Sequence, residues 1–391
     1  MKNTAYLQNV QTLRENIYKT RFDEIESLGL LGTYMTVSAN LLTYLPHLSS
    51  NDHYNKIQDI QFHRALSNVD QYYLSLLGDL KVFDKANVIK QSLDVSHIFV
   101  TYHTGSYRMF IQYLTRQNVP FCLVTEKRFI NDQGRVVQKI FKEMKRDQNA
   151  ELEILAAENP RLIFELTSKL RNGTSVVFYI DGNTGVTEKK LNDNNNLLKI
   201  NFLNNHLYAR QGIAFLAYLS RAPLAVAIAK RKKNLSNTIR IKPIDTKKLI
   251  EKKERNNFIN TVTKKLYKEL ELFLTKYPEQ WEGWFYVDKF FNRDFTEQVN
   301  EEREIPDFSK PATLILDQFA HLFKYDSNNF FLITRRDYKF LQITNSLYET
   351  LNFFKKPRQI IPDTTLVVNQ HEVDLETLME LIKMKLLNPI Q

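Results

Sequence analysis

The sequence predicts an α/β fold in which a largely parallel or mixed sheet is flanked by helices, with an N-terminal helical segment and a small C-terminal α+β unit. Three observations support this fold class. Apolar residues recur at helical spacing over residues 1–90. Short apolar runs then alternate with helical patterns up to about residue 231, and short strand-like runs dominate residues 311–391.

These changes of pattern divide the chain of 391 residues into three parts. Residues 1–90 are expected to form a helical segment, and residues 91–294 an α/β domain. Residues 311–391 are expected to form a small α+β unit, of winged-helix or peptide-recognition type. The polar, proline-containing residues 295–310 have the composition of a linker.

Within the α/β domain, each strand pattern is followed by a helix pattern. The expected strands are 94–102, 119–125, 150–155, 174–180 and 222–231, and the expected helices are 105–117, 134–147, 159–173, 211–221 and about 247–276. Such alternation implies right-handed crossovers between parallel strands. Because ligands bind beyond the carboxyl ends of such strands, His103 and Asp181, which each follow an expected strand, can meet at one edge of the sheet.

Composition and charge narrow the classes of protein. The lone Cys122 lies in an apolar run, which excludes internal disulfides and favours a reducing compartment. The N-terminus lacks a signal-peptide pattern and no run is long enough to span a bilayer, so we expect a cytoplasmic protein with at most peripheral membrane contact. The net charge of +10, concentrated in runs such as 230–234 and 247–255, favours an anionic partner, although solvated helix faces also explain it.

Several chemistries lack their sequence signatures. The chain contains no GxSxG, Walker A or GxGxxG motif and no cysteine or histidine set with zinc spacing, so we expect neither a metal nor a resident cofactor. Nucleic-acid binding would depend on charge alone, which gives an affinity that collapses as salt rises. We therefore expect no nucleic-acid partner.

Four motifs occur in an order that resembles a known family. They are "HTGSY" and "VVFYIDGNTG", each after an apolar run, then "RQGIAFLAYLSRAPLAVAI", and finally "YPEQWEGW". Residues 90–290 resemble the lipid A late acyltransferases and related mannolipid acyltransferases of the lysophospholipid acyltransferase superfamily. The resemblance implies transfer of an acyl group from an acyl carrier protein or CoA thioester to a hydroxyl or amine of a metabolite, peptide or lipid precursor.

The resemblance also implies that His103 is the general base. The family uses a His-x4-acidic motif, in which the acidic residue orients the imidazole and stabilises its charged form. Here the matching residue is Arg108, a cation that cannot accept the imidazole proton. Three interpretations remain open: another carboxylate, Asp181 or Glu126, orients the ring; a backbone carbonyl does so; or activity is lost and the protein is a binding or scaffold partner.

Further candidates surround this motif. The expected helix start places the backbone N–H groups of Gly105 and Ser106 where they could bind a developing oxyanion, although capping of the helix would explain the same residues. Arg108 is included among the substrate- or oxyanion-binding candidates. An Asp-Gly pair is also typical of a tight turn, so a role of Asp181 in the turn is as well supported by the sequence as a role in the site.

Three more arginines are candidates by resemblance. Arg128 and Arg135 fall where the family places basic residues for a donor or acceptor headgroup. Arg210 would lie at the entrance of the site, suited to a phosphate or carboxylate, or it forms a surface ion pair. Trp281 and Trp284 are expected in the core.

The C-terminal unit bears on the acceptor. Its strand-like runs followed by a helix resemble small domains that bind leader peptides in modified-peptide biosynthesis. That likeness implies a peptide or carrier-bound acceptor held at an exposed strand edge. A dimerisation or packing module is the alternative.

Overall fold

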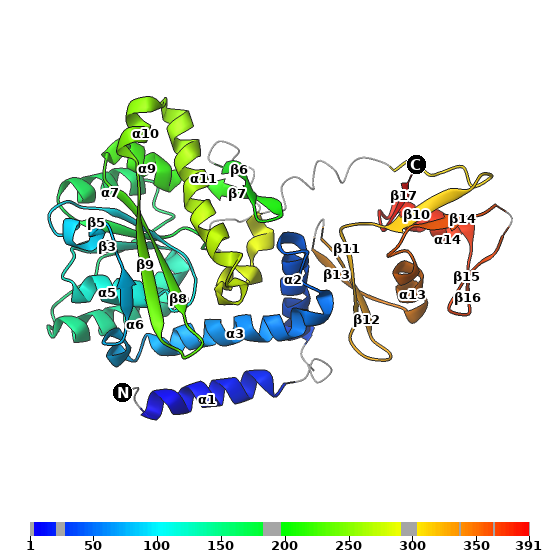
Figure 1. Ribbon diagram of the computed structural model, residues 1–391, viewed down its shortest axis with the longest axis horizontal. Helices are drawn as coiled ribbons and strands as arrows, with labels where there is room; N and C mark the ends of the chain where they lie inside the picture. The colour runs from blue at the N-terminus through cyan, green and yellow to red at the C-terminus, as the bar shows by residue number, and fades with distance from the viewer. Residues whose placement is uncertain are drawn as a thin grey trace. The chain divides into compact units, whose positions relative to one another are not determined.

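The computed structural model describes residues 4–20, 28–182, 197–290, 303–335, 338–362 and 364–390 (Figure 1). Its chain divides into two compact units. Unit 1 contains residues 1–19 and 44–290, and unit 2 contains residues 20–43 and 291–391. Half of the expected linker, residues 295–302, and residues 183–196 of the loop after Gly182 lie outside the described residues.

Unit 1 is built on a seven-stranded mixed sheet with the order β1-β9-β8-β2-β5-β3-β4. The strands are β1 (Lys81–Phe83), β2 (Ile98–Thr101), β3 (Phe121–Thr125), β4 (Ile154–Ala156), β5 (Ser175–Tyr179), β8 (Leu224–Arg231) and β9 (Asn237–Ile244). The strands β8, β2, β5, β3 and β4 run parallel, whereas β9 is antiparallel to β8. The expected α/β class with a largely parallel or mixed sheet is confirmed.

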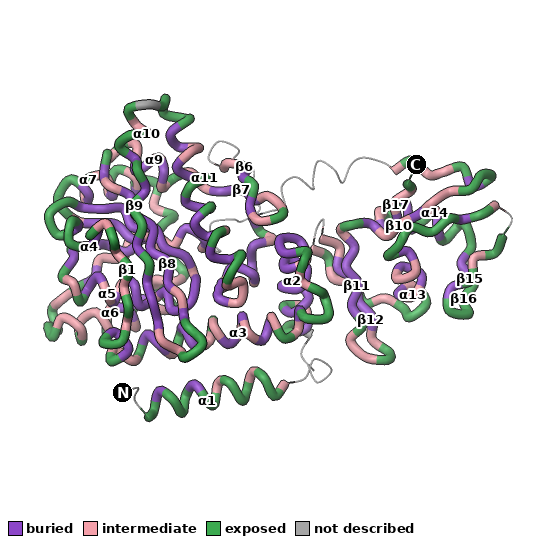
Figure 2. Tube along the Cα trace, viewed as in Figure 1, coloured by how far each residue is buried: buried purple, intermediate pink, exposed green. Residues whose placement is uncertain are grey.

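Unit 1 also contains helices. They are α1 (Thr4–Tyr18), α3 (His53–Asp70), α4 (Val88–Gln91), α5 (Met109–Arg116), α6 (Lys127–Lys145), α7 (Leu162–Arg171), α9 (Gly212–Ser220), α10 (Lys247–Lys252) and α11 (Arg255–Leu274). One face of the sheet packs on α4, α5 and α6 through a buried cluster that includes Phe99 and Phe110. Val100 and Val226, whose side chains point to the other face, are buried as well. Both faces are therefore covered, as parallel strands require, and Figure 2 shows the central strands as buried.

The turn before α5 differs from the expected helix start at residues 104–106. Gly105 has a φ of +52°, and a Cβ there would lie 2.9 Å from the carbonyl oxygen of Ala229. Thr104 forms an isolated β-bridge with Trp281. The turn is thus pressed against β8 in a left-handed conformation that only glycine adopts readily, and the helix begins later, at Met109.

One other expected element also differs. The basic helix expected over about 247–276 is interrupted because Lys253 is extended, with φ −133° and ψ 139°, so α10 and α11 are separate helices. Outside the elements expected above, β6 (Leu197–Phe202) pairs with β7 (Asn205–Arg210) in a hairpin that is not part of the main sheet.

Residues 1–90 do not form a unit of their own. The helices α1 and α3 belong to unit 1, and β1 joins the main sheet by pairing with β9. Nearly all of α2 (Leu28–Tyr44) belongs to unit 2. α1 and α3 pack together in one buried cluster, whereas Ser38 of α2 is hydrogen-bonded to His321 of unit 2.

Unit 2 contains small antiparallel sheets with α2, α13 (Asn345–Phe353) and α14 (Leu375–Lys383). Its strands are β10 (Ala312–Leu316), β11 (Ala320–Lys324), β12 (Phe330–Thr334), β13 (Lys339–Ile343), β14 (Arg358–Ile360), β15 (Leu366–Val368), β16 (His371–Val373) and β17 (Leu387–Ile390). Three of the strand-like runs noted in residues 311–391 correspond to β11, β12 and β13, which form one sheet in that order. Leu332, Leu351 and Leu378 lie in its core.

Among the helices in the described ranges, none combines the length and the apolar character needed to cross a bilayer.

Candidate active site

His103 and Asp181 meet at the carboxyl edge of the main sheet. The strands β2 and β5 are parallel neighbours with Thr101 opposite Tyr179, so the residues that follow them lie side by side. His103 Nδ1 is 2.8 Å from Asp181 Oδ1, and the backbone N–H of His103 donates to Asp181 Oδ2 at 3.0 Å. Asp181 is therefore the residue that orients the imidazole, through two contacts to the same histidine.

A third donor fixes the Asp181 carboxylate. The indole Nε1 of Trp281 donates to Asp181 Oδ2 at 2.7 Å, and Asp181 is only 2% exposed. Because a carboxylate only accepts hydrogen bonds, this arrangement assigns the proton of the neutral imidazole to Nδ1. The lone pair then lies on Nε2 of His103, for which the described residues offer no hydrogen-bond partner.

Two tyrosines hold the ring of His103 from the sides. The ring centroid of Tyr107 is 4.7 Å from that of His103, and the Tyr179 centroid is 5.0 Å away. Burial alone would lower the pKa of His103, but the charge and hydrogen bond of Asp181 outweigh it, and the net shift is upward. Glu282 raises the same pKa further, whereas Arg108 lowers it.

His103 opens onto a cavity of about 450 Å³, within the size range of small-molecule pockets. Polar residues of its wall include Arg108, Glu126 and Glu282 as well as His103. The remaining wall is largely apolar and comes from β3, α5, α6, α7 and β5; examples are Leu123, Phe129, Val137, Phe141, Met144 and Leu166. The cavity thus joins a reactive imidazole to an apolar chamber.

The turn that carries His103 is paired with residues 280–282. The N–H of Gly105 donates to the carbonyl oxygen of Gln280 at 2.8 Å, and the N–H of Glu282 donates to the carbonyl oxygen of His103 at 3.0 Å. The Gly105 donor expected to bind an oxyanion is therefore already occupied. Gly105 instead serves the close packing of this turn.

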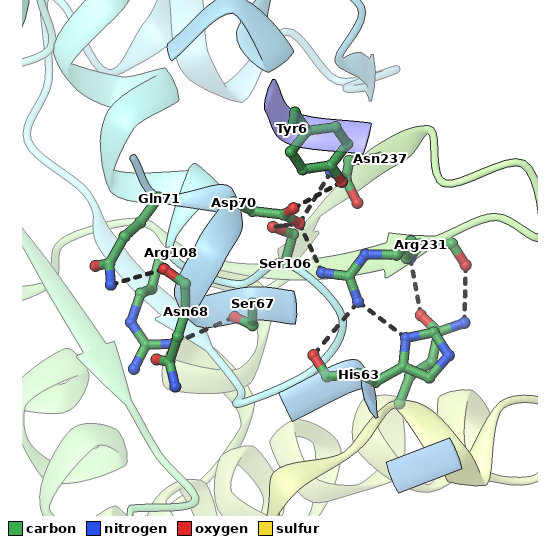
Figure 3. A network of polar contacts seen from close by, with 11 residues as sticks. Tyr6, His63, Ser67, Asn68, Asp70, Gln71, Ser106, Arg108, Arg231 and Asn237 are labelled. Carbon is green, nitrogen blue, oxygen red and sulfur yellow. Dashed lines mark hydrogen bonds and ion pairs between the residues drawn. The ribbon is translucent and has the colours of Figure 1, made fainter. Parts of the chain in front are cut away.

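Ser106 is likewise absent from the cavity wall. Its hydroxyl donates to Asp70 Oδ2 at 2.6 Å, and the residue is 1% exposed. The same Asp70 oxygen accepts a bond of 2.6 Å from Arg231, and the other accepts one of 2.9 Å from Tyr6 (Figure 3). The Ser106 side chain is thus part of a buried network that fastens the turn to α3 and β8.

Arg231 extends this network to Gln280 of the motif "YPEQWEGW". Its guanidinium lies 2.9 Å from His63 Nδ1, and burial together with the Arg231 charge lowers the pKa of His63 to about 3. Its backbone N–H and carbonyl oxygen both bind the Gln280 side chain, each at 2.8 Å. The two chain segments that form the site are therefore anchored to one buried arginine.

The other expected site residues fall into two groups. Glu126 lies in the cavity wall without contacting His103, and burial, reinforced by the nearby charge of Glu158, raises its pKa. Arg210 also lines the cavity, and burial lowers its pKa. Arg128 and Arg135 are exposed on α6, outside the cavity wall.

Sequence patterns did not identify several residues of the site. Glu282 lies 3.3 Å from Arg64 and accepts a long hydrogen bond of 3.4 Å from Tyr107, and all three line the cavity. Trp281 and Trp284 are buried, as expected, but Trp281 also binds Asp181. The sequence feature that could have identified Trp281 and Glu282 as site residues is the motif "YPEQWEGW", in which they are adjacent.

The described residues contain no group of three or more histidine, cysteine, aspartate or glutamate side chains that could hold a metal ion. Cys122 is buried, and burial raises the pKa of its thiol to about 12. No protein-family model matches the chain, and no curated protein matches its sequence.

Proposed function

We propose that unit 1 is an acyltransferase that moves an acyl group from an acyl carrier protein or CoA thioester to a hydroxyl or amine. The observation that carries the proposal is the 2.8 Å contact between His103 Nδ1 and Asp181 Oδ1, in a histidine that lines the cavity and whose Nε2 has no hydrogen-bond partner among the described residues. A histidine held in this way can accept a proton at Nε2 while a carboxylate stabilises the resulting imidazolium.

The proposed reaction has two steps at His103. In the first, Nε2 accepts the proton of the acceptor hydroxyl or amine as that group attacks the thioester carbonyl carbon and forms a tetrahedral adduct. In the second, the adduct collapses, the carbon–sulfur bond breaks, and the imidazolium returns its proton to the departing thiolate. Asp181 positions the ring throughout, and the products are the acylated acceptor and the free thiol.

The apolar part of the cavity suits the acyl chain. Its wall of leucine, phenylalanine, valine and methionine side chains offers few hydrogen-bonding groups, and each methylene buried there contributes about 0.8 kcal/mol. A chain held in this chamber would keep the thioester carbonyl close to His103. The ordered motifs of residues 90–290 point to the same reaction class by resemblance.

The departure at Arg108 does not deprive His103 of a carboxylate. In the resembled family the acidic residue lies five positions after the histidine, where this chain has Arg108. Asp181 supplies a carboxylate from the neighbouring strand end instead. The proposed catalytic pair is therefore His103 and Asp181, with Glu126 as a second carboxyl group in the cavity wall.

The test is thiol release from short-, medium- and long-chain acyl-CoA and acyl carrier protein, measured with and without a panel of alcohols and amines. We expect His103→Ala to reduce turnover by about 10²- to 10⁴-fold, because a positioned base contributes that much. The matched control is Arg171→Gln, an exposed side chain at the end of α7 outside the cavity wall, which should retain turnover. Equal turnover in wild type and His103→Ala, or binding of acyl-CoA without any turnover, would contradict the proposal and favour a binding protein.

A further inference from the structure

Arg108 has an unusual set of partners for an arginine beside a catalytic histidine. Its NH1 group donates to the Ser67 hydroxyl at 3.2 Å, and its guanidinium carbon lies 4.4 Å from the centre of the Tyr107 ring. In the described ranges, no carboxylate lies within ion-pair distance of it. The positive charge of Arg108 is therefore not neutralised by an acidic side chain.

Two nearby arginines, unlike Arg108, are paired with carboxylates. Arg231 is paired with Asp70 at 2.6 Å, and Arg64, in the same cavity wall as Arg108, lies 3.3 Å from Glu282. Figure 3 shows Arg108 reaching Ser67 on one side of α3, while Asp70 on the same helix receives Arg231. The neighbouring cations thus have acidic partners and Arg108 has a hydroxyl.

The unused donors of Arg108 are accessible from the cavity. A guanidinium has five N–H donors, and Ser67 accepts from only one of the three nitrogens. None of its nitrogens is both buried and without a partner, and Arg108 lines the cavity. Donors that are neither bonded nor sealed off can therefore receive a ligand.

An oxyanion is the ligand that this group fits best. Stacking on the Tyr107 ring stabilises the cation, but a neutral ring does not replace a counter-ion. Carboxylates and phosphates accept two parallel N–H bonds from a guanidinium, a geometry that supplies both charge and direction. Two such bonds would occupy two of the four N–H donors that Ser67 leaves free.

We propose that Arg108 binds a carboxylate or phosphate group of the acceptor and so selects an anionic acceptor for the reaction at His103. The guanidinium of Arg108 and the imidazole of His103 both contact the ring of Tyr107. The phosphate of a phosphopantetheine arm lies at the far end from the thioester, so an anion beside the base belongs to the acceptor. The identification of the ligand as the acceptor rests on the proposed acyl transfer, whereas the anion-binding site itself does not.

Binding is tested without turnover, by NMR of the full chain labelled on its histidine rings. The signals of His103, one of eight histidines, are assigned by their loss in His103→Gln. Inorganic phosphate and acetate are then titrated as probes. We expect saturable shifts of the His103 signals and a rise in the His103 pKa, because the bound anion offsets the Arg108 charge that lowers it.

Variants separate the proposal from its rivals. In Arg108→Gln the saturable shift should disappear and the anion-free pKa of His103 should already be higher, since the opposing charge is gone. Arg108→Lys should bind each probe at least tenfold more weakly, because it keeps the charge without the paired donors. Arg171→Gln, which removes an exposed arginine outside the cavity wall, should behave as wild type.

Unchanged anion binding in Arg108→Gln, or no saturable binding in wild type, would overturn the inference. Competition between phosphate and free CoA for the same His103 shift would also overturn it, because the anion would then belong to the donor. Failure of acyl transfer in wild type would contradict the proposed function and leave these binding results unaffected. The two ideas therefore fail in different experiments.

Discussion

Two polar clusters border the turn at residues 103–108, and they differ in how completely their charges are paired. Asp70 and Arg231 are both fully buried, 2.6 Å apart, and Tyr6 and Ser106 also donate to Asp70. His103 and Arg108 are partly exposed to a cavity, and each has hydrogen-bonding atoms that the described residues do not use. The first cluster has the properties of a structural support, and the second those of a ligand site.

The difference has a physical basis. A buried charge without a partner is costly, so a fold keeps such a charge only with its partners in place. A charge next to a cavity can remain without a protein partner because water, or a ligand, completes its bonds. Ser106 and Arg108, two positions apart, reach Asp70 and Ser67 on the same helix and so belong one to each cluster.

The largest effect should come from breaking the buried cluster. Asp70→Asn leaves the guanidinium of Arg231 buried without a counter-charge, and we expect a loss of about 3–5 kcal/mol in the free energy of unfolding. Denaturant titration followed by tryptophan fluorescence reports on unit 1, because both tryptophans, Trp281 and Trp284, lie there. Asp132→Asn, which removes an exposed ion pair with Arg128, is the control and should change stability by under about 0.5 kcal/mol. A loss that small in Asp70→Asn would remove the distinction between the clusters.

A smaller effect should appear as a pH dependence of stability. The folded protein lowers the pKa of His63 to about 3, so between that value and the usual value of 6.5 the unfolded state binds a proton that the folded state does not. Stability should therefore fall as pH decreases below 6.5, with up to about 1.4 kcal/mol per pH unit arising from His63. His63→Gln should flatten this slope, whereas His371→Gln, on an exposed residue of unit 2, should not. An unchanged slope in His63→Gln would mean that another group causes the acid sensitivity.

The fold was more predictable than the site. Alternating apolar runs and helical patterns predicted β2, β3, β5 and β8, and the meeting of His103 with Asp181 followed from two parallel strand ends. The position of β1, the antiparallel β9 and the division of the N-terminal helices between two units depend on long-range packing, which local periodicity does not contain.

Within the site, the sequence left Asp181 and Glu126 as alternatives because nothing in the residues around them distinguishes their distances to His103. The role of Ser106 depends on Asp70, 36 positions earlier, and the occupation of the Gly105 N–H depends on Gln280. The left-handed turn at Gly105 also depends on how closely it approaches β8. These contacts join segments that are distant in the chain, so spacing alone could not identify them.

The most direct test of the central claim is the pH dependence of thiol release in wild type and Asp181→Asn. In wild type, activity should rise with pH through a pKa above 6.5, because Asp181 favours the charged imidazole and only the neutral ring acts as base. Asp181→Asn should shift that midpoint to lower pH and reduce the plateau by about 10²-fold or more, since the ring loses its orienting charge. The same midpoint and plateau in both proteins would contradict the assignment of His103 and Asp181 as the catalytic pair.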